Sequence, residues 1–273
     1  MRRVFLFLWG LASLACRESQ PAAGDGGAGG LGGSGAWAGT GGGSGGSAAC
    51  ANGPAVVSFI TDDGVKLEAD DYPTGEGIGP SVVLLHMIPP ANDRKNYPQT
   101  FIDALVQKKI RVLNVDRRGA GASEGVAQDA YLGPSGQLDA KAAVQHLLSG
   151  QCGVDPLRIG LVGASNGTTT ALDYAVYAAE NPDQPLPSAM VFLTGGAYTE
   201  SQNALGDHHD PLDAVPIQFV FSPAEGGWSL GYQKGAPKSW RFEELDPGDH
   251  GTKMFEASAE STARVAGFLA EVL

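Results

Sequence analysis

From residue 81 onward, short apolar runs alternate with segments that can form helices, and no other feature constrains the fold as strongly. Runs such as Ser81–His86 and Ile217–Phe221 are almost continuously apolar, which is typical of strands buried on both faces. Strands of this kind, separated by helices, predict an α/β fold with a mostly parallel sheet covered by helices on both faces. Functional groups in such sheets gather at the carboxyl ends of the strands.

The alternation gives a specific order of expected elements. A hairpin of Val56–Ile60 and Val65–Ala69, turning at Asp62-Asp63-Gly64, precedes the alternating part. Further strands are expected at residues 81–86, 111–116, 158–162, 189–193, 217–221 and 239–244. Helices are expected at residues 98–108, 138–149, 166–181 and 253–273, with a weaker one at 202–214.

The N-terminal residues do not belong to this pattern. Met1-Arg2-Arg3 and the apolar run Val4–Ala15 are shaped like a secretory signal and are too short to span a bilayer, so we expect residues 1–16 to direct export to the bacterial cell envelope. Leu11–Cys16 resembles a lipobox, which makes Cys16 the expected lipidation site and the only expected attachment to a membrane. Ser13-Leu14-Ala15 also fits an ordinary cleavage site, so a secreted soluble protein remains an alternative.

Residues 17–50 are rich in Gly and Ser and predict a flexible tether with an r.m.s. reach of about 30 Å. Residues 51–273 then suffice for one compact α/β domain. In an exported protein Cys50 and Cys152 could form a disulfide, with two free thiols as the alternative. The net charge of −12 argues against nucleic-acid binding, and no Cys or His spacing predicts a metal site, so no cofactor is expected.

The pentapeptide Gly163–Gly167 matches the G-x-S-x-G pattern of a nucleophile elbow, in which glycines permit a tight turn that exposes the serine. Two other segments match the pattern equally well. Gly42–Gly46 lies in the low-complexity tract, and Gly121–Gly125 lies in a loop with no helix directly behind it. Only Ser165 has a strand immediately before it and a helix immediately after it, so Ser165 is the candidate nucleophile.

Three ordered blocks make residues 55–273 resemble the α/β-hydrolase superfamily. Residues 82–86 end like the strand that leads into the family's oxyanion loop, and Asp116–Ser123 looks like its D-x-R-G-x-G-x-S segment. Gly163–Gly167 is the third block. The resemblance implies an α/β-hydrolase fold with an eight-stranded type of sheet, and a triad in the chain order Ser, acid, His.

The resemblance also implies the remaining members of the triad. His250 follows the last strand and precedes the closing helix, which is the family's position for the catalytic imidazole, whereas His86 is expected to be structural. Glu225 follows strand 217–221 and would be the acid that orients the imidazole. Asp246 and Asp213 remain alternatives for this acid.

An oxyanion hole is implied by the same resemblance. The amide of Asn166, directly after the serine, would supply one donor. The second would come from Met87 or Ile88, because the following Pro89-Pro90 has no N–H to donate. The family usually has Gly after its equivalent of His86, so this loop departs from the pattern.

One helix, one strand and the weak helix fill the interval between Ser165 and strand 217–221, which leaves no room for a cap domain. The implied function is a serine hydrolase that acts on a carboxylic ester or related small acyl compound through an acyl-enzyme. An acyltransferase and a non-catalytic, surface-displayed binding module of the same fold are the alternatives. Tyr198, Trp228 and Tyr232 lie in loops that could line the substrate pocket or simply pack beneath those loops.

Overall fold

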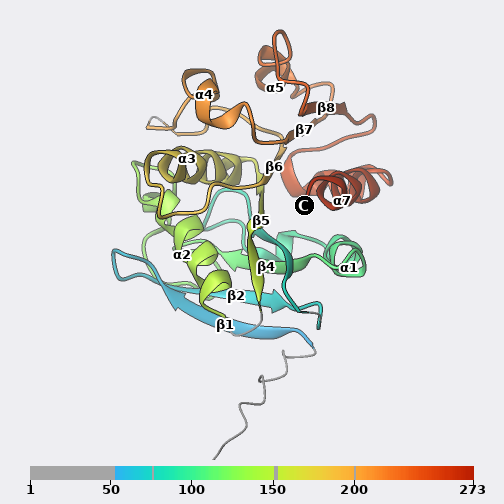
Figure 1. The fold of residues 1–273 in the computed structure, drawn as a ribbon. Coiled ribbons are helices and arrows are strands. Elements are labelled where there is room, and N and C mark those ends of the chain that lie inside the picture. Colours follow the sequence, from blue (N-terminus) through green and yellow to red (C-terminus); the bar gives the residue numbers. More distant parts are fainter. Residues whose placement is uncertain (1–52, 76, 151–152, 200) are drawn as a thin grey trace, which may run out of the picture. The chain divides into compact units, whose positions relative to one another are not determined.

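Figure 1 shows the computed structural model, which describes residues 53–75, 77–150, 153–199 and 201–273. The expected signal peptide and tether, with the lipidation site Cys16, lie outside the described residues. The same is true of Cys50 and Cys152, the two cysteines of the expected disulfide. Within the described ranges, no helix is both long enough and apolar enough to cross a membrane.

The described part of the chain contains one eight-stranded sheet with the strand order β1-β2-β4-β3-β5-β6-β7-β8. β1 (Ala55–Ile60) and β2 (Lys66–Tyr72) form the expected antiparallel hairpin, and β2 is also antiparallel to β4. The other neighbours are parallel, which confirms the predicted mostly parallel sheet. These strands are β3 (Gly79–Leu85), β4 (Arg111–Asp116), β5 (Val154–Ala164), β6 (Ala189–Leu193), β7 (Ile217–Phe221) and β8 (Trp240–Glu244).

Four longer helices cover the two faces of the sheet (Figure 1). α2 (Gly136–Ser149) and α3 (Asn166–Glu180) pack on one face, and α1 (Gln99–Gln107) and α7 (Ser261–Val272) pack on the other. Alternate residues of a strand enter opposite cores, because side chains alternate across a pleated sheet. Val83 and Leu85 thus join the core under α2 and α3, whereas Val82 and Leu84 join the core under α1 and α7.

Two of the expected helices are interrupted. The segment 202–214 forms only a 3-10 turn, η3 (Leu205–Asp207), and a short helix, α4 (His209–Leu212). Pro211 lacks an N–H, so a helix that contains it can only have begun just before it. The expected helix at 253–273 is divided at the extended residue Ser258, whose carbonyl accepts the amide and hydroxyl of Ser261.

The remaining elements are short. The pieces before the second interruption are η4 (Gly251–Lys253) and α6 (Met254–Ala257). α5 (Gly227–Gly231) lies in a segment expected to be a loop. The 3-10 turns η1 (Arg94–Asn96) and η2 (Ala127–Ala130) follow β3 and β4 respectively.

The beginning of α3 lies unusually close to the end of β3, and glycine makes this approach possible. A Cβ at Gly167 would lie 2.2 Å from the carbonyl oxygen of Leu85 and 2.6 Å from that of His86. A Cβ at Gly163 would lie 2.5 Å from the carbonyl oxygen of Gly167. These two glycines therefore serve close packing of backbone on backbone.

We expect Gly167→Ala to lower the free energy of unfolding by about 1–3 kcal/mol, because the backbone carbonyls that it would contact cannot move aside. Gly267→Ala in α7 is the matched control, since a Cβ there would meet no atom within 4 Å. The control should be neutral or up to about 1 kcal/mol more stable than the wild type. Urea unfolding of both variants measures the difference, and equal stabilities would contradict this account of the packing.

Candidate functional site

Ser165 occupies a strained turn between β5 and α3. Its φ of 49° and ψ of −122° lie outside the regions that residues other than glycine ordinarily adopt. The Ser165 amide donates to the carbonyl of Leu193 at 2.8 Å, and the Ser165 carbonyl accepts the amide and hydroxyl of Thr168 at 2.9 and 2.7 Å. The neighbouring strand and the first turn of the helix thus hold the serine in this conformation.

The side chains of Ser165, His250 and Glu225 form a continuous hydrogen-bonded chain. His250 Nε2 lies 2.6 Å from Ser165 Oγ, and His250 Nδ1 lies 2.7 Å from Glu225 Oε1. A carboxylate can only accept, so Glu225 holds the Nδ1 proton and leaves Nε2 as the basic nitrogen facing the hydroxyl. The side chains of His250 and Glu225 are each about one-third exposed, at 35% and 36%.

The local turn after β7 brings Glu225 to this position. The Glu225 amide donates to the Ser222 carbonyl at 3.0 Å, which folds the chain back toward His250. Of the two alternative acids, Asp213 pairs with His209 Nδ1 at 2.8 Å, and Asp246 is exposed on the surface. Because Glu225 already occupies His250 Nδ1, the geometry favours Glu225 over both aspartates.

His86, at the end of β3, is a neutral imidazole in a fixed tautomer. Its Nε2 accepts the backbone N–H of Arg117 at 2.9 Å, so the ring proton is on Nδ1, which donates to the Met87 carbonyl at 2.7 Å. Burial, followed by the charge of Arg117, lowers the pKa of His86 from its usual 6.5 to about 3. His86 therefore shapes the loop after β3 and takes no part in proton transfer near neutral pH.

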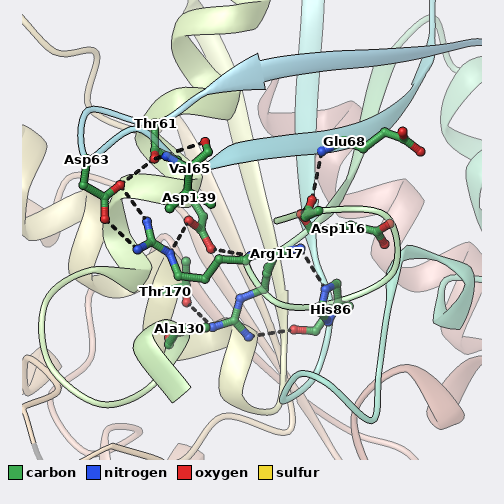
Figure 2. A network of polar contacts seen from close by, with 12 residues as sticks. Thr61, Asp63, Val65, Glu68, His86, Asp116, Arg117, Ala130, Asp139 and Thr170 are labelled. Atoms are coloured by element: carbon green, nitrogen blue, oxygen red, sulfur yellow. Dashed lines mark hydrogen bonds and ion pairs between the residues drawn. The ribbon is translucent and has the colours of Figure 1, made fainter. Parts of the chain in front are cut away.

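The side chain of Arg117 is fully buried, and Figure 2 shows its guanidinium between His86, Ala130 and Thr170. Burial lowers the pKa of Arg117 to about 10, so the group is still charged at pH 7. Its terminal nitrogens donate to the carbonyls of His86, Met87 and Ala130, to Asn166 Oδ1 and to Thr170 Oγ1, at 3.2, 3.4, 2.9, 2.9 and 2.7 Å respectively. One side chain thereby connects the loop after β3, the segment before α2 and the first turn of α3.

This network determines where the amides of Met87 and Ile88 point. In a trans peptide the N–H is directed opposite to the C=O. Because the carbonyls of His86 and Met87 face Arg117, the next amides face away from it. Over the described ranges neither amide donates a hydrogen bond, and Asn166 is the first residue of α3, where amides lack an intrahelical acceptor. None of the three amides predicted for the oxyanion hole is thus engaged with an acceptor among the described residues.

Ser123 belongs to Gly121–Gly125, the other segment of the folded domain that matches the G-x-S-x-G pattern, and its contacts indicate a structural role. Its hydroxyl donates to the Asp116 carbonyl at 2.6 Å and accepts the Glu68 amide at 2.8 Å. The Asp116 carboxylate in turn accepts the amides of Arg94 and Ala122 at 2.8 and 2.9 Å. These contacts, partly visible in Figure 2, lock the loop after β4 onto β2 and leave Ser123 without an adjacent base.

Of the three aromatic residues considered for the pocket, only Tyr198 contacts the triad. Its ring meets that of His250 edge-on, with centroids 6.2 Å apart. Burial raises the pKa of the Tyr198 hydroxyl, which donates to the Thr194 carbonyl at 2.7 Å. Trp228 and Tyr232 instead pack against Phe219 in the core.

Histidines and carboxylates elsewhere do not gather into a further centre in the part of the chain that the structure describes. No group of three His, Cys, Asp or Glu there could hold a metal ion. His209 pairs with Asp213 and stacks on Trp240 with ring centroids 5.9 Å apart. His146 stacks on Phe59 at 4.9 Å.

Two residues at the site were not singled out by the sequence. Arg117 is the variable residue of the D-x-R-G-x-G-x-S block, and Thr194 follows β6. Each is the first residue after a parallel strand, at the edge of the sheet where functional groups gather. That position is the signal that could have identified them.

The comparison with known proteins gives partial matches. No family model matches the chain. Residues of this chain are 34% identical over 122 residues to the thiohydrolase aneE of Aspergillus aculeatus, and 37% identical over 117 residues to the uncharacterized protein Rv2307c of Mycobacterium tuberculosis. The matches cover 44% and 42% of this chain but only 37% and 39% of those relatives. The chain thus spans well under half the length of the curated relatives that it matches.

Solved structures match over most of the domain. The esterase Pf2001 of Pyrococcus furiosus superposes with a TM-score of 0.59 at 19% identity, covering 80% of this chain and 90% of that one. The dienelactone hydrolase of Anabaena variabilis gives 0.56 at 18% identity, covering 80% and 95% respectively. The chain has the α/β-hydrolase fold. At these identities the structural likeness shows the fold alone, and the activity is argued below from the site.

The neutral state of His86 makes stability depend on pH in a defined direction. Since the folded pKa is about 3 and the usual value is 6.5, the unfolded chain binds the extra proton first. The stability contributed by neutral His86 is therefore fully present above about pH 6.5 and is lost progressively down to about pH 3.

We expect His86→Gln, which keeps an acceptor but cannot titrate, to lack this component. The free energy of unfolding of the wild type minus that of the variant should decrease by about 1.4 kcal/mol for each unit by which the pH falls between about 6 and 4. Urea unfolding at pH 7, 6, 5 and 4 measures the gap. A gap that does not change with pH would show that His86 is not held neutral.

Proposed function

We propose that this chain is a serine hydrolase that cleaves carboxylic esters or related acyl compounds through an acyl-enzyme on Ser165. The observation that carries the proposal is the chain of short contacts from Ser165 Oγ through both nitrogens of His250 to Glu225, at 2.6 and 2.7 Å. This arrangement is the one that activates a serine hydroxyl, because the base is in contact and its proton position is fixed.

The first half of the reaction follows from this geometry. His250 Nε2 takes the Ser165 proton as Oγ attacks the acyl carbon, and Glu225 stabilises the imidazolium that forms. The negative charge on the former carbonyl oxygen is stabilised by the Asn166 amide and by the amide of Met87 or Ile88. Collapse of this intermediate forms the acyl-serine and breaks the bond to the leaving group, which takes the proton from His250.

The second half repeats these steps with water as the nucleophile. His250 takes a proton from water, hydroxide adds to the acyl carbon, and Ser165 leaves with the proton returned. An alcohol or amine that replaced water would yield acyl transfer by the same steps. Among the described residues between β6 and β7, the only helical elements are η3 and α4, so no cap domain is described in this interval.

The similar proteins support a choice of test substrates. One curated relative is named a thiohydrolase, and one structural neighbour is an esterase. Ester and thioester substrates with short acyl chains are therefore the first panel to assay. The hydrolysed bond differs between them, but both give the same acyl-serine.

We expect a fluorophosphonate to label the wild-type protein covalently and tryptic mass mapping to locate the label on Ser165. Ser165→Ala should not label, and its turnover of any ester that the wild type hydrolyses should fall by roughly a millionfold. Ser123→Ala is the matched control, which should label like the wild type because Ser123 has no adjacent base. A wild-type protein that neither labels nor hydrolyses any member of the panel would instead support a non-catalytic binding module.

The identity of the acid has its own test. Glu225→Gln should reduce kcat by roughly 10³- to 10⁴-fold, because an amide cannot fix the Nδ1 proton or stabilise the imidazolium. Asp246→Asn and Asp213→Asn should retain turnover, since neither aspartate contacts His250. Near-normal turnover in Glu225→Gln together with a collapse in Asp246→Asn would assign the acid to Asp246.

A further inference from the structure

The residue directly after β6, Thr194, has a backbone conformation that its side chain does not favour. Its φ is 53°, in the left-handed region, and Thr is β-branched, for which positive φ is a genuine outlier. Such outliers persist only when surrounding contacts determine them. At Thr194 the contacts come from three directions, and two of them lead to the proposed triad.

The Thr194 hydroxyl holds the loop that carries His250. Oγ1 accepts the amide of Gly251, the residue after His250, at 3.0 Å in a buried position. On the other side of this loop, a Cβ at Gly251 would lie 2.6 Å from Met87 Sδ and 3.5 Å from Ser165 Cβ. The chain at 250–251 therefore lies directly against the elbow, and the Thr194 hydroxyl fixes it there.

The Thr194 backbone holds two further elements. Its amide donates to the Val220 carbonyl of β7 at 2.8 Å, which extends the sheet by one residue. Its carbonyl accepts the Tyr198 hydroxyl at 2.7 Å, and Tyr198 meets the His250 ring edge-on. The strained backbone is what lets one residue direct its carbonyl to Tyr198 and its hydroxyl to Gly251.

Gly196 and Tyr198 have hydrogen bonds to Gln202 that do not involve Thr194. Gln202 accepts the Tyr198 amide at 2.8 Å and donates to the Gly196 carbonyl at 2.9 Å. Thr169 in α3 donates to the same Gln202 oxygen at 2.9 Å. These hydrogen bonds hold Tyr198 beside the imidazole of His250.

We propose that Thr194 is a positioning residue of the active site, which sets the distance and angle between His250 and Ser165 through the Gly251 amide and through Tyr198. This inference rests on the proposed serine hydrolase function. A glycine at this position would adopt the positive φ without strain, but it would leave the buried Gly251 amide without its acceptor. The Thr194 hydroxyl is thus needed as the acceptor for the Gly251 amide, next to His250.

Three substitutions separate positioning from a general effect on stability. Thr194→Val keeps the shape and removes the acceptor, Thr194→Ser keeps the acceptor, and Thr194→Gly removes the acceptor while relieving the strain. For Thr194→Val and Thr194→Gly we expect kcat and the second-order rate of fluorophosphonate labelling to fall by roughly 10- to 100-fold, with KM changed much less. Thr194→Ser should recover most of the rate.

Unfolding midpoints of the same variants identify a merely structural role, because such a role would move the midpoint without changing kcat of the folded protein. If Thr194→Val does not fold, the strain-free Thr194→Gly carries the test. Wild-type kcat and labelling rate in a folded Thr194→Val or Thr194→Gly would overturn the inference. A wild-type protein that does not label would instead overturn the proposed function, so the two failures are distinguishable.

Discussion

The buried guanidinium of Arg117 is the interaction on which the arrangement of the site depends. Removing a charge from water is costly, and the cost is acceptable only when the group has hydrogen-bond partners and a nearby opposite charge. Arg117 has acceptors in the loop after β3, in the segment before α2 and in α3, and the neighbouring Asp139 favours its charged form. Asp139 also forms an ion pair with Arg118 at 2.8 Å, so the charge of one buried carboxylate stabilises both arginines. The network therefore joins segments that are distant in the sequence and reaches Asn166, the residue after the serine.

Two residues with a strained backbone lie at the ends of two adjacent strands. Ser165 and Thr194 both have positive φ, and the Ser165 amide donates to Leu193, the residue before Thr194. The parallel pairing of β5 with β6 places these ends side by side. Each strained residue presents a hydroxyl, one toward the imidazole of His250 and the other toward the Gly251 amide. The sheet thus holds conformations that the isolated segments would not adopt.

Much of the fold could be predicted from the sequence, because it follows from local patterns. Continuous apolar runs gave the parallel strands, and order along the chain brought Ser165, Glu225 and His250 to the same edge of the sheet. The interruptions of two expected helices, at His208 before α4 and at Ser258, were missed. The roles of Arg117 and Thr194 could not be predicted, because decisive partners, His86 for Arg117 and Gly251 for Thr194, lie far away in the sequence. The elbow glycines were expected for conformational freedom, whereas the structure shows that they permit close backbone packing.

The central claim is that Ser165 forms a covalent bond with the acyl group of the substrate. Intact-protein mass spectrometry after reaction with an aryl carbamate tests it most directly, because a carbamoyl-serine hydrolyses slowly enough to accumulate. The account predicts one carbamoyl group per wild-type molecule on the peptide that contains Ser165, formed together with one equivalent of the aryl alcohol. Continued release of the aryl alcohol with no added mass on the protein, and at the same rate in Ser165→Ala, would contradict it.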